Sequence, residues 1–217
     1  MAEIEITQLP IRGHSGVALP NRFFRQAGKA RELALVLPGL NYTADNPLLY
    51  YPTRLLAERG ADVLQVRADY THSEFQALER LEQMRWLGAD AQAAVQAGQS
   101  QRDYGRLILI GKSIGTLTEA YLVSQCGCAQ ATTIWLTPLL RQPWLVDAAL
   151  QCRGRALFIA GTGDRTYDQE ALQRIQDATG ARALLLPGAN HSLEIAGDLQ
   201  QSLKFMQEIL QTIADFL

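Results

Sequence analysis

The sequence predicts an α/β fold, in which a mostly parallel sheet carries helices on both faces. Three observations predict it: short runs rich in Val, Ile and Leu recur along the chain, segments of helical character separate them, and the two kinds alternate from Leu33 to the C-terminus. A short continuous apolar run is typical of a strand that is covered on both faces, as in a parallel sheet. When strands and helices alternate in this way, each helix connects two parallel strands by a right-handed crossover.

The predicted parallel strands cover residues 33–37, 62–66, 106–110, 132–136, 156–160 and 183–186. The N-terminal segment differs. Residues 3–8 alternate between polar and apolar side chains, which is typical of a strand with one solvated face. Residues 16–24 can pair with this strand, and we expect an antiparallel hairpin at one edge of the sheet.

Helices are expected between these strands. The segments 47–59, 75–97 and 115–125 each end just before or close to a glycine, at Gly60, Gly98 and Gly127. Glycine just past the last turn is a helix stop signal. A further helical run, 169–178, follows Asp168, a residue type that caps helix N-termini.

The segment 138–154 holds enough apolar residues, Trp144 among them, for one short helix. It is too short for a helical lid. The C-terminal segment 193–217 has the pattern of an amphipathic helix that packs on the sheet. Its apolar side chains recur three or four residues apart, at Leu199, Leu203, Met206, Ile209 or Leu210, Ile213 and Phe216.

The length and the net charge of the chain limit its possible domain organisation and partners. With 217 residues, no repeats and no linker rich in Pro, Gly or Ser, residues 1–217 are expected to form a single domain. The net charge of −2 provides no basic surface for nucleic acid or anionic lipid. No apolar run reaches ~18 residues, and the N-terminus lacks the regions of a secretory signal. We therefore expect a cytoplasmic protein that binds neither nucleic acid nor membrane, and the sequence leaves its oligomeric state open.

The cysteines indicate neither a disulfide framework nor a metal site. There are 3 of them, an odd number, and Cys152 lies far along the chain from Cys126 and Cys128. A zinc site needs further Cys or His ligands at suitable spacing, and no second pair supplies them. The three are expected to be small thiols that fill core space. No metal and no cofactor is expected.

The strongest chemical signal is Gly111-Lys112-Ser113-Ile114-Gly115, between the strand 106–110 and the helix 115–125. A strand that turns sharply into a helix forces its central residue into a strained conformation, and side chains two residues before and after it would collide. In this context the G-x-S-x-G pattern predicts that Ser113 is a nucleophile. The serine stands at the helix N-terminus, where the helix dipole favours developing negative charge. The alternative is a plain glycine-rich turn.

A nucleophilic serine needs a neighbouring base, usually an imidazole that a carboxylate orients. The chain has 3 histidines. His14 and His72 precede Ser113, whereas His191 follows the last predicted strand. Because the acid and then the base follow the nucleophile in sites of this kind, we predict His191 as the base. The alternative for His191 is a helix-start residue, and His72 is either a solvated loop residue or an edge of the pocket.

Two aspartates follow the strand 156–160, and one of them is expected to orient the imidazole. Asp164 lies nearer to the strand end, and Asp168 immediately precedes the helical run 169–178. Helix capping explains an aspartate at the second position without a catalytic role. We therefore predict Asp164 as the acid, with Asp168 as the alternative.

A second backbone amide for the developing oxyanion is expected from the loop after the strand 33–37. The amide of Leu40 is placed to act there with that of Ile114. Asn41 and Tyr42 follow and are candidates for substrate contact, with a turn-forming asparagine as the alternative. Lys112 is a third candidate for substrate contact, and its alternative is a lysine solvated at the turn.

Together these motifs resemble the α/β-hydrolase superfamily, in its compact dienelactone-hydrolase-like branch. The resemblance runs from about Leu33 to Leu217 and rests on Leu37-Pro38-Gly39-Leu40, Gly111-Lys112-Ser113-Ile114-Gly115, Gly161-Thr162-Gly163-Asp164 and Pro187-Gly188-Ala189-Asn190-His191-Ser192. It implies the same nucleophile, acid, base and oxyanion amides. The chain departs from many relatives at Pro38, where they have histidine, and at Thr116, where they have glycine. Its serine also replaces the cysteine of dienelactone hydrolase itself.

The predicted reaction is cofactor-free hydrolysis of a small acyl substrate, a carboxylic ester or thioester, through an acyl-enzyme on Ser113. Amide or other acyl transfer would use the same groups. The rival interpretation is a non-catalytic binding or regulatory domain that kept the fold, since fold alone does not imply activity. Because the segment 138–154 is short, we expect an open pocket that prefers short or compact acyl groups.

Overall fold

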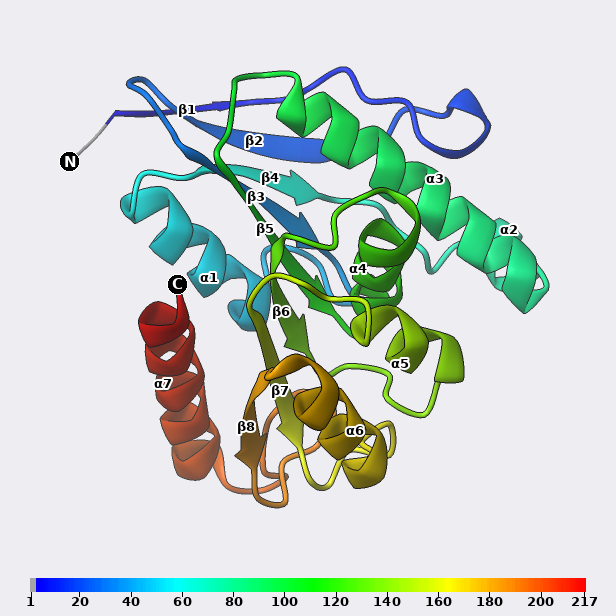
Figure 1. Ribbon diagram of the computed structural model, residues 1–217, viewed down its shortest axis with the longest axis vertical. Helices are drawn as coiled ribbons and strands as arrows, with labels where there is room; N and C mark the ends of the chain where they lie inside the picture. Colours follow the sequence, from blue (N-terminus) through cyan, green and yellow to red (C-terminus); the bar gives the residue numbers. More distant parts are fainter. Residues whose placement is uncertain (1–2) are drawn as a thin grey trace.

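Eight strands form one sheet in the computed structural model, which describes residues 3–217 (Figure 1). They are β1 (Ile4–Thr7), β2 (Asn21–Gln26), β3 (Glu32–Leu37), β4 (Asp62–Val66), β5 (Arg106–Lys112), β6 (Thr132–Leu136), β7 (Ala156–Gly161) and β8 (Arg182–Leu186). The order across the sheet is β1-β2-β4-β3-β5-β6-β7-β8. From β4 to β8 all neighbours are parallel, and β2 runs antiparallel to both β1 and β4. The mostly parallel sheet and the antiparallel pair at its edge are confirmed, with the second strand of that pair later in the chain than predicted.

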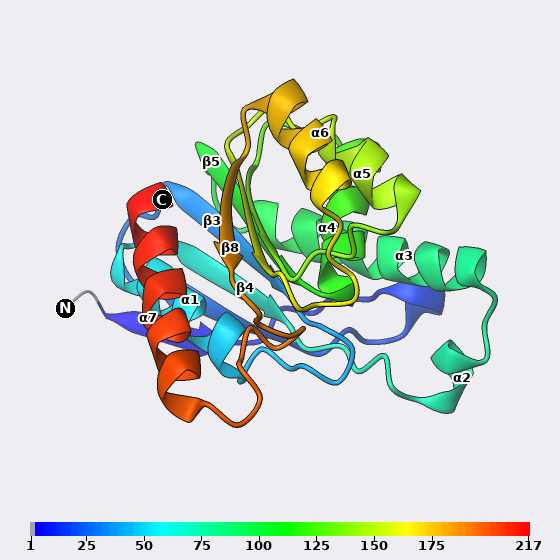
Figure 2. The same ribbon diagram turned by 90° about the horizontal axis from the view of Figure 1, so that it is seen from below.

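Helices cover both faces of the sheet. They are α1 (Pro47–Glu58), α2 (Ser73–Gln76), α3 (Arg80–Gln99), α4 (Ile114–Gln125), α5 (Pro143–Ala149), α6 (Gln169–Thr179) and α7 (Leu199–Phe216), with a short 3-10 turn η1 (His14–Gly16). Figure 2 shows α1 and α7 on one face and α3 to α6 on the other. Successive residues of β5 alternate between the two layers: Ile108 and Ile110 pack with the α1 and α7 side, and Leu109 packs with the α3 and α4 side. The strand is therefore apolar throughout because both of its faces are buried.

Two predicted helices differ from the structure. The predicted helix 75–97 is divided between the end of α2 and most of α3, because Glu79 has an extended backbone (ψ 151°) that interrupts the helical turn. The terminal helix starts only at Leu199, where the side chain of Asp198 caps it by accepting a hydrogen bond from the Gln201 amide.

The buried face of α7 agrees with the prediction in its C-terminal half and differs from it at the N-terminal end. Leu199 and Leu203 are 70% and 56% exposed, so the two are not part of the core. The residues that pack on the sheet are Phe205, Ile209, Ile213 and Phe216. Ile209, Ile213 and Phe216 belong to the predicted stripe, and Phe205 was not predicted. Helical spacing therefore predicted the C-terminal part of the buried face and not its N-terminal part.

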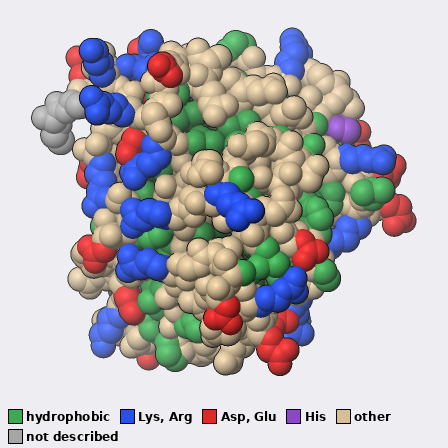
Figure 3. All heavy atoms as spheres, viewed as in Figure 1, with side chains coloured by type: hydrophobic (Ala, Val, Ile, Leu, Met, Phe, Trp, Pro, Cys, Tyr) green, Lys and Arg blue, Asp and Glu red, His purple; other side chains and the backbone are tan. Residues whose placement is uncertain are grey.

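Between β6 and β7 the chain forms α5 and loops, so there is no large lid, as predicted. Trp144 on α5 is 36% exposed. It lines a hollow of about 760 Å³ together with residues of α3 and α4, including Leu81, Met84 and Tyr121. Hydrophobic, basic and acidic side chains adjoin over the first turns of α3, at the right of Figure 3. Within residues 3–217 no helix combines the length and the apolar character needed to cross a membrane.

The three cysteines, all within the described residues 3–217, are unpaired thiols. Cys128 and Cys152 are buried and Cys126 is half-buried. Burial raises the pKa of Cys128 to about 11 and that of Cys152 to about 12. Both thiols therefore stay protonated at neutral pH and pack as small apolar groups, as the sequence predicted.

Candidate active site

The turn between β5 and α4 holds Ser113 in a strained conformation. Its backbone has φ 55° and ψ −117°, in the left-handed half of the map that residues with a side chain rarely adopt. A Cβ atom on Gly111 would lie 2.5 Å from the carbonyl oxygen of Gly115, and one on Gly115 would lie 2.5 Å from that of Leu37. Both positions therefore require glycine, which is the physical basis that the sequence predicted for the motif.

Three loops at the carboxyl ends of β5, β7 and β8 bring Ser113, Asp164 and His191 together. The Nε2 atom of His191 lies 2.8 Å from Ser113 Oγ, and its Nδ1 atom lies 2.6 Å from Asp164 Oδ2. The His191 side chain is 37% exposed and that of Asp164 is 3% exposed. The imidazole thus bridges a buried carboxylate and the hydroxyl of the half-buried Ser113, the arrangement that general-base activation of a serine needs.

The Asp164 carboxylate is stabilised in its ionised form. Burial opposes ionisation, but hydrogen bonds from His191 and from the Thr166 amide, 2.8 Å from Asp164 Oδ1, outweigh it and lower the pKa of Asp164. An ionised carboxylate only accepts hydrogen bonds, so the Nδ1 atom of His191 carries the proton and Nε2 is free to accept one from Ser113.

Thr166 is a site residue that the sequence analysis missed. Besides its amide contact, its hydroxyl lies 3.4 Å from His191 Nδ1. The spacing Asp164-x-Thr166 is a signal that was available, because an aspartate often accepts a hydrogen bond from the amide two residues later.

Asp168, the alternative acid, has a different role in the structure. Its side chain accepts a hydrogen bond of 3.0 Å from the Ala171 amide and so caps the N-terminus of α6. The carboxylate that His191 contacts is Asp164.

The loop after β3 forms a tight turn next to Ser113. The amide of Gly39 donates to the Tyr42 carbonyl (2.9 Å), and that of Tyr42 donates to the Gly39 carbonyl (3.3 Å). Asn41 has φ 53°, so it is the turn-forming residue that the alternative interpretation expected. Within residues 3–217 the amide of Leu40 makes no hydrogen bond. The amide of Ile114 opens α4 and has no carbonyl one turn earlier to bond.

Two of the candidates for substrate contact have partners within the protein. The Tyr42 hydroxyl accepts a hydrogen bond of 3.0 Å from the Leu48 amide at the start of α1. Lys112 is only 3% exposed, so the solvated lysine considered as an alternative is wrong. Lys112 lies at the end of the strand that leads into Ser113. Its ammonium donates a hydrogen bond to the His191 carbonyl. Contact of either residue with substrate stays a prediction.

Thr116, where many relatives have glycine, is fully buried below Ser113. Its hydroxyl donates to the Ser113 carbonyl at 2.6 Å and accepts from the Leu139 amide at 3.4 Å. The larger side chain therefore joins the turn to the segment before α5.

The other histidines lie in a separate cluster. The ring of His14 stacks on Trp86 (centroids 4.4 Å apart), and His72 lies 5.4 Å from the same indole. His72 caps α2 by accepting from the Phe75 amide at 3.3 Å, so its position is structural. Neither ring contacts the Ser113 site.

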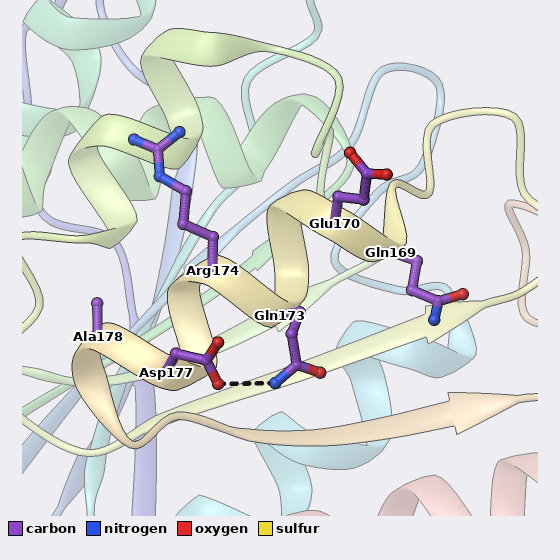
Figure 4. A pocket seen from close by; sticks show the side chains of 6 residues that line it. All are labelled: Gln169, Glu170, Gln173, Arg174, Asp177 and Ala178. Carbon is purple, nitrogen blue, oxygen red and sulfur yellow. Dashed lines mark hydrogen bonds between the residues drawn. The ribbon is translucent and has the colours of Figure 1, made fainter.

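Two hollows differ in their chemistry. A cavity of about 420 Å³ opens beside the acid and the base, and is lined by Gly163, Asp164, Arg165, Thr166, Asn190, His191 and Ser192. A shallower hollow of about 840 Å³ lies along one face of α6. Its lining side chains come from that helix alone, and the contact between them is Gln173 with Asp177 (Figure 4). Its lining includes no serine, cysteine or histidine. Within residues 3–217 no three His, Cys, Asp or Glu side chains are grouped to hold a metal ion.

The chain matches no protein-family model and no curated protein. Solved structures share its fold. An α/β serine hydrolase without a lid from Xanthomonas campestris has a TM-score of 0.69 at 16% identity, over 99% of this chain and 95% of that one. A dienelactone hydrolase-like promiscuous phosphotriesterase from metagenomic libraries has a TM-score of 0.69 at 17% identity, over 100% and 99%.

A cold-adapted esterase from an Arctic intertidal metagenomic library is similar in the same way, with a TM-score of 0.70 at 13% identity, over 99% of this chain and 94% of that one. At these identities the likeness shows the fold. Residues 3–217 have the α/β-hydrolase fold in a compact form with no large lid domain, as the sequence predicted.

Proposed function

We propose that this protein is a serine hydrolase that cleaves carboxylic esters through an acyl-enzyme on Ser113. The observation that carries the proposal is the continuous hydrogen-bonded chain from Ser113 through His191 to Asp164, at a strained turn. Strain of this kind persists where the surrounding structure enforces it, and such positions cluster at active sites. The similar structures described as an esterase and as a serine hydrolase support the same class of reaction.

In the proposed first step Ser113 Oγ attacks the ester carbonyl carbon while its proton passes to His191 Nε2. Asp164 holds the opposite nitrogen as a donor and stabilises the imidazolium that forms. The amides of Leu40 and Ile114 donate to the carbonyl oxygen as it becomes negative. The carbon–oxygen bond to the alcohol then breaks, and the alcohol leaves with the proton from His191.

In the second step water attacks the carbonyl carbon of the acyl-enzyme and gives a proton to His191. The bond from that carbon to Ser113 Oγ then breaks, Oγ takes the proton back from His191, and the carboxylic acid leaves. A thioester would follow the same steps with a thiol as the leaving group. Every transfer uses side chains or amides of this chain.

Active-site labelling tests the proposal. A fluorophosphonate probe is expected to modify Ser113 in the purified protein, because the probe reacts with activated serines. The Ser113→Ala variant should lose both the label and p-nitrophenyl acetate turnover, the latter by about a thousandfold or more. Ser100→Ala, at an exposed serine at the end of α3, is the matched control and should keep both. A folded wild-type protein that is neither labelled nor active would instead favour a binding domain.

A further inference from the structure

Lys112 is buried directly beside the proposed nucleophile. It is the last residue of β5 and is 3% exposed. The other lysines of the chain, Lys29 and Lys204, are exposed. Burying an ammonium group costs free energy unless its surroundings provide compensating contacts, so the contacts of Lys112 indicate what holds it there.

These contacts come from two separate loops of the site. The Nζ atom donates a hydrogen bond of 3.2 Å to the carbonyl oxygen of His191, 79 residues later in the chain. The same atom lies 4.6 Å from the ring centre of Tyr42, a cation–π contact with the loop that carries Leu40. Its stem packs against that loop as well, since a Cβ atom on Gly39 would lie 3.1 Å from Lys112 Cδ.

The titratable groups around Lys112 come from the loops after β3, β7 and β8. Asp164, from the loop after β7, favours the ammonium form but is itself bonded to His191. Tyr42 is the titratable group on the loop after β3, and Glu194, from the loop after β8, acts on Tyr42. Burial is the larger effect and lowers the pKa of Lys112 to about 8.

We propose that Lys112 is a positioning residue, whose ammonium group holds the backbone of His191 and the oxyanion loop in place around Ser113. The inference rests on the proposed function. The side chain joins three segments that must keep their relative positions to within a fraction of an ångström during the reaction, and a shift of about 1 Å can cost on the order of a hundredfold in rate.

The ammonium form should matter because a hydrogen bond from a charged donor is roughly twice as strong as one from a neutral donor. Loss of the proton leaves an amine that holds the His191 carbonyl and the Tyr42 ring less firmly. The rate at which Ser113 reacts should therefore fall as the pH rises through about 8, the pKa of Lys112. A role limited to packing would produce no such fall.

The experiment measures the rate constant of fluorophosphonate labelling of the full chain between pH 6 and pH 10. Lys112→Met removes the charge but keeps the length of the side chain, and Lys112→Arg keeps a charge that does not titrate in this range. Lys204→Met on α7 is the matched control. Thermal unfolding is recorded for each variant, and the lysine titrations are followed by NMR on protein labelled at Cε.

We expect Lys112→Met to label about tenfold to a hundredfold more slowly than the wild type, with unchanged or higher thermal stability because a buried charge has been removed. The wild type should lose about fivefold in rate above the pH at which one lysine signal titrates. Lys112→Arg should show no alkaline fall, and Lys204→Met should behave as the wild type.

Equal labelling of Lys112→Met and wild type across the pH range would overturn the inference and leave the proposed function intact. If Lys112→Met does not fold, the wild-type profile decides, because a rate that stays constant while the lysine titrates is incompatible with the inference. A wild type that is not labelled at any pH would overturn the proposed function and this inference with it.

Discussion

Replacement of Glu119 by glutamine is expected to stabilise the protein, increasingly so as the pH rises. Glu119 lies on α4 with no exposed surface. Its carboxyl group packs directly behind the Ser113 turn, since a Cβ atom on Gly111 would lie 2.7 Å from Glu119 Oε2. Neither carboxyl oxygen has a hydrogen-bond partner of good geometry in the described part of the chain. Burial therefore raises the pKa of Glu119 well above its ordinary value, against a smaller opposing effect of the Gly111 and Ile134 backbone.

The sign and size of the effect follow from linkage. Burial favours the protonated form of Glu119 in the folded state, whereas the unfolded chain releases the proton above a pKa of about 4.3. Each pH unit above that value lowers the free energy of unfolding by about 1.4 kcal/mol, until the pKa of the folded state is reached. Glutamine does not titrate, so Glu119→Gln avoids this loss of unfolding free energy. The extra N–H donor of glutamine changes the free energy of unfolding by the same amount at every pH.

The assay is urea unfolding of wild type and Glu119→Gln at several pH values from 4.5 to 7.5. The difference in unfolding free energy should be smallest at the lowest pH and should grow as the pH rises, by at most about 1.4 kcal/mol per pH unit. Glu208→Gln, at an exposed position on α7, is the control and should follow the wild type. A difference that is independent of pH would refute the reasoning, because Glu119 would then have the same protonation in both states.

Two further predictions concern the site. Asp164→Asn should lower turnover by about a thousandfold or more, because His191 loses the carboxylate that fixes its tautomer. Asp168→Ala should instead cost about 1 kcal/mol of stability through the lost cap of α6, measured by thermal unfolding, and keep most of the activity. For acyl chain length, kcat/KM of p-nitrophenyl esters should level off after a few carbons, because the segment between β6 and β7 provides α5 alone as cover. Each buried methylene would otherwise contribute about 0.8 kcal/mol.

Either result can be contradicted directly. Lost turnover in Asp168→Ala with full turnover in Asp164→Asn would identify the other aspartate as the acid. A steady rise of kcat/KM from acetate to palmitate, measured below the micelle threshold, would indicate a covered apolar tunnel.

The fold was predictable because its signals are local. The strands 62–66 and 132–136 have the predicted bounds, and β5 runs on to Lys112 past the predicted end at Ile110. An apolar run that is buried on both faces is visible in the sequence whatever packs on it. The break between α2 and α3 was not predicted, since it depends on the backbone of Glu79 and on the capping of α2 by His72.

The arrangement of Ser113, Asp164 and His191 could also be predicted, because chain order and adjacent strand ends bring the three loops to one edge of a parallel sheet. The catalytic roles of these three residues are part of the proposed function. Thr166 was missed although its signal is local. Asp164 was preferred because Asp168 was expected to cap the following helix, and in the structure Asp168 does cap α6.

The sequence by itself determined the kind of elements, their order and the strained turn at Ser113, because these depend on periodicity and on glycine at positions where a Cβ atom has no room. The tertiary structure alone decided that Lys112 is buried, that Glu119 is fully buried and that Leu203 on α7 faces solvent. The physical reason is that exposure is a property of surfaces supplied by distant segments. Lys112 contacts a loop 79 residues away, and no spacing within β5 encodes that contact.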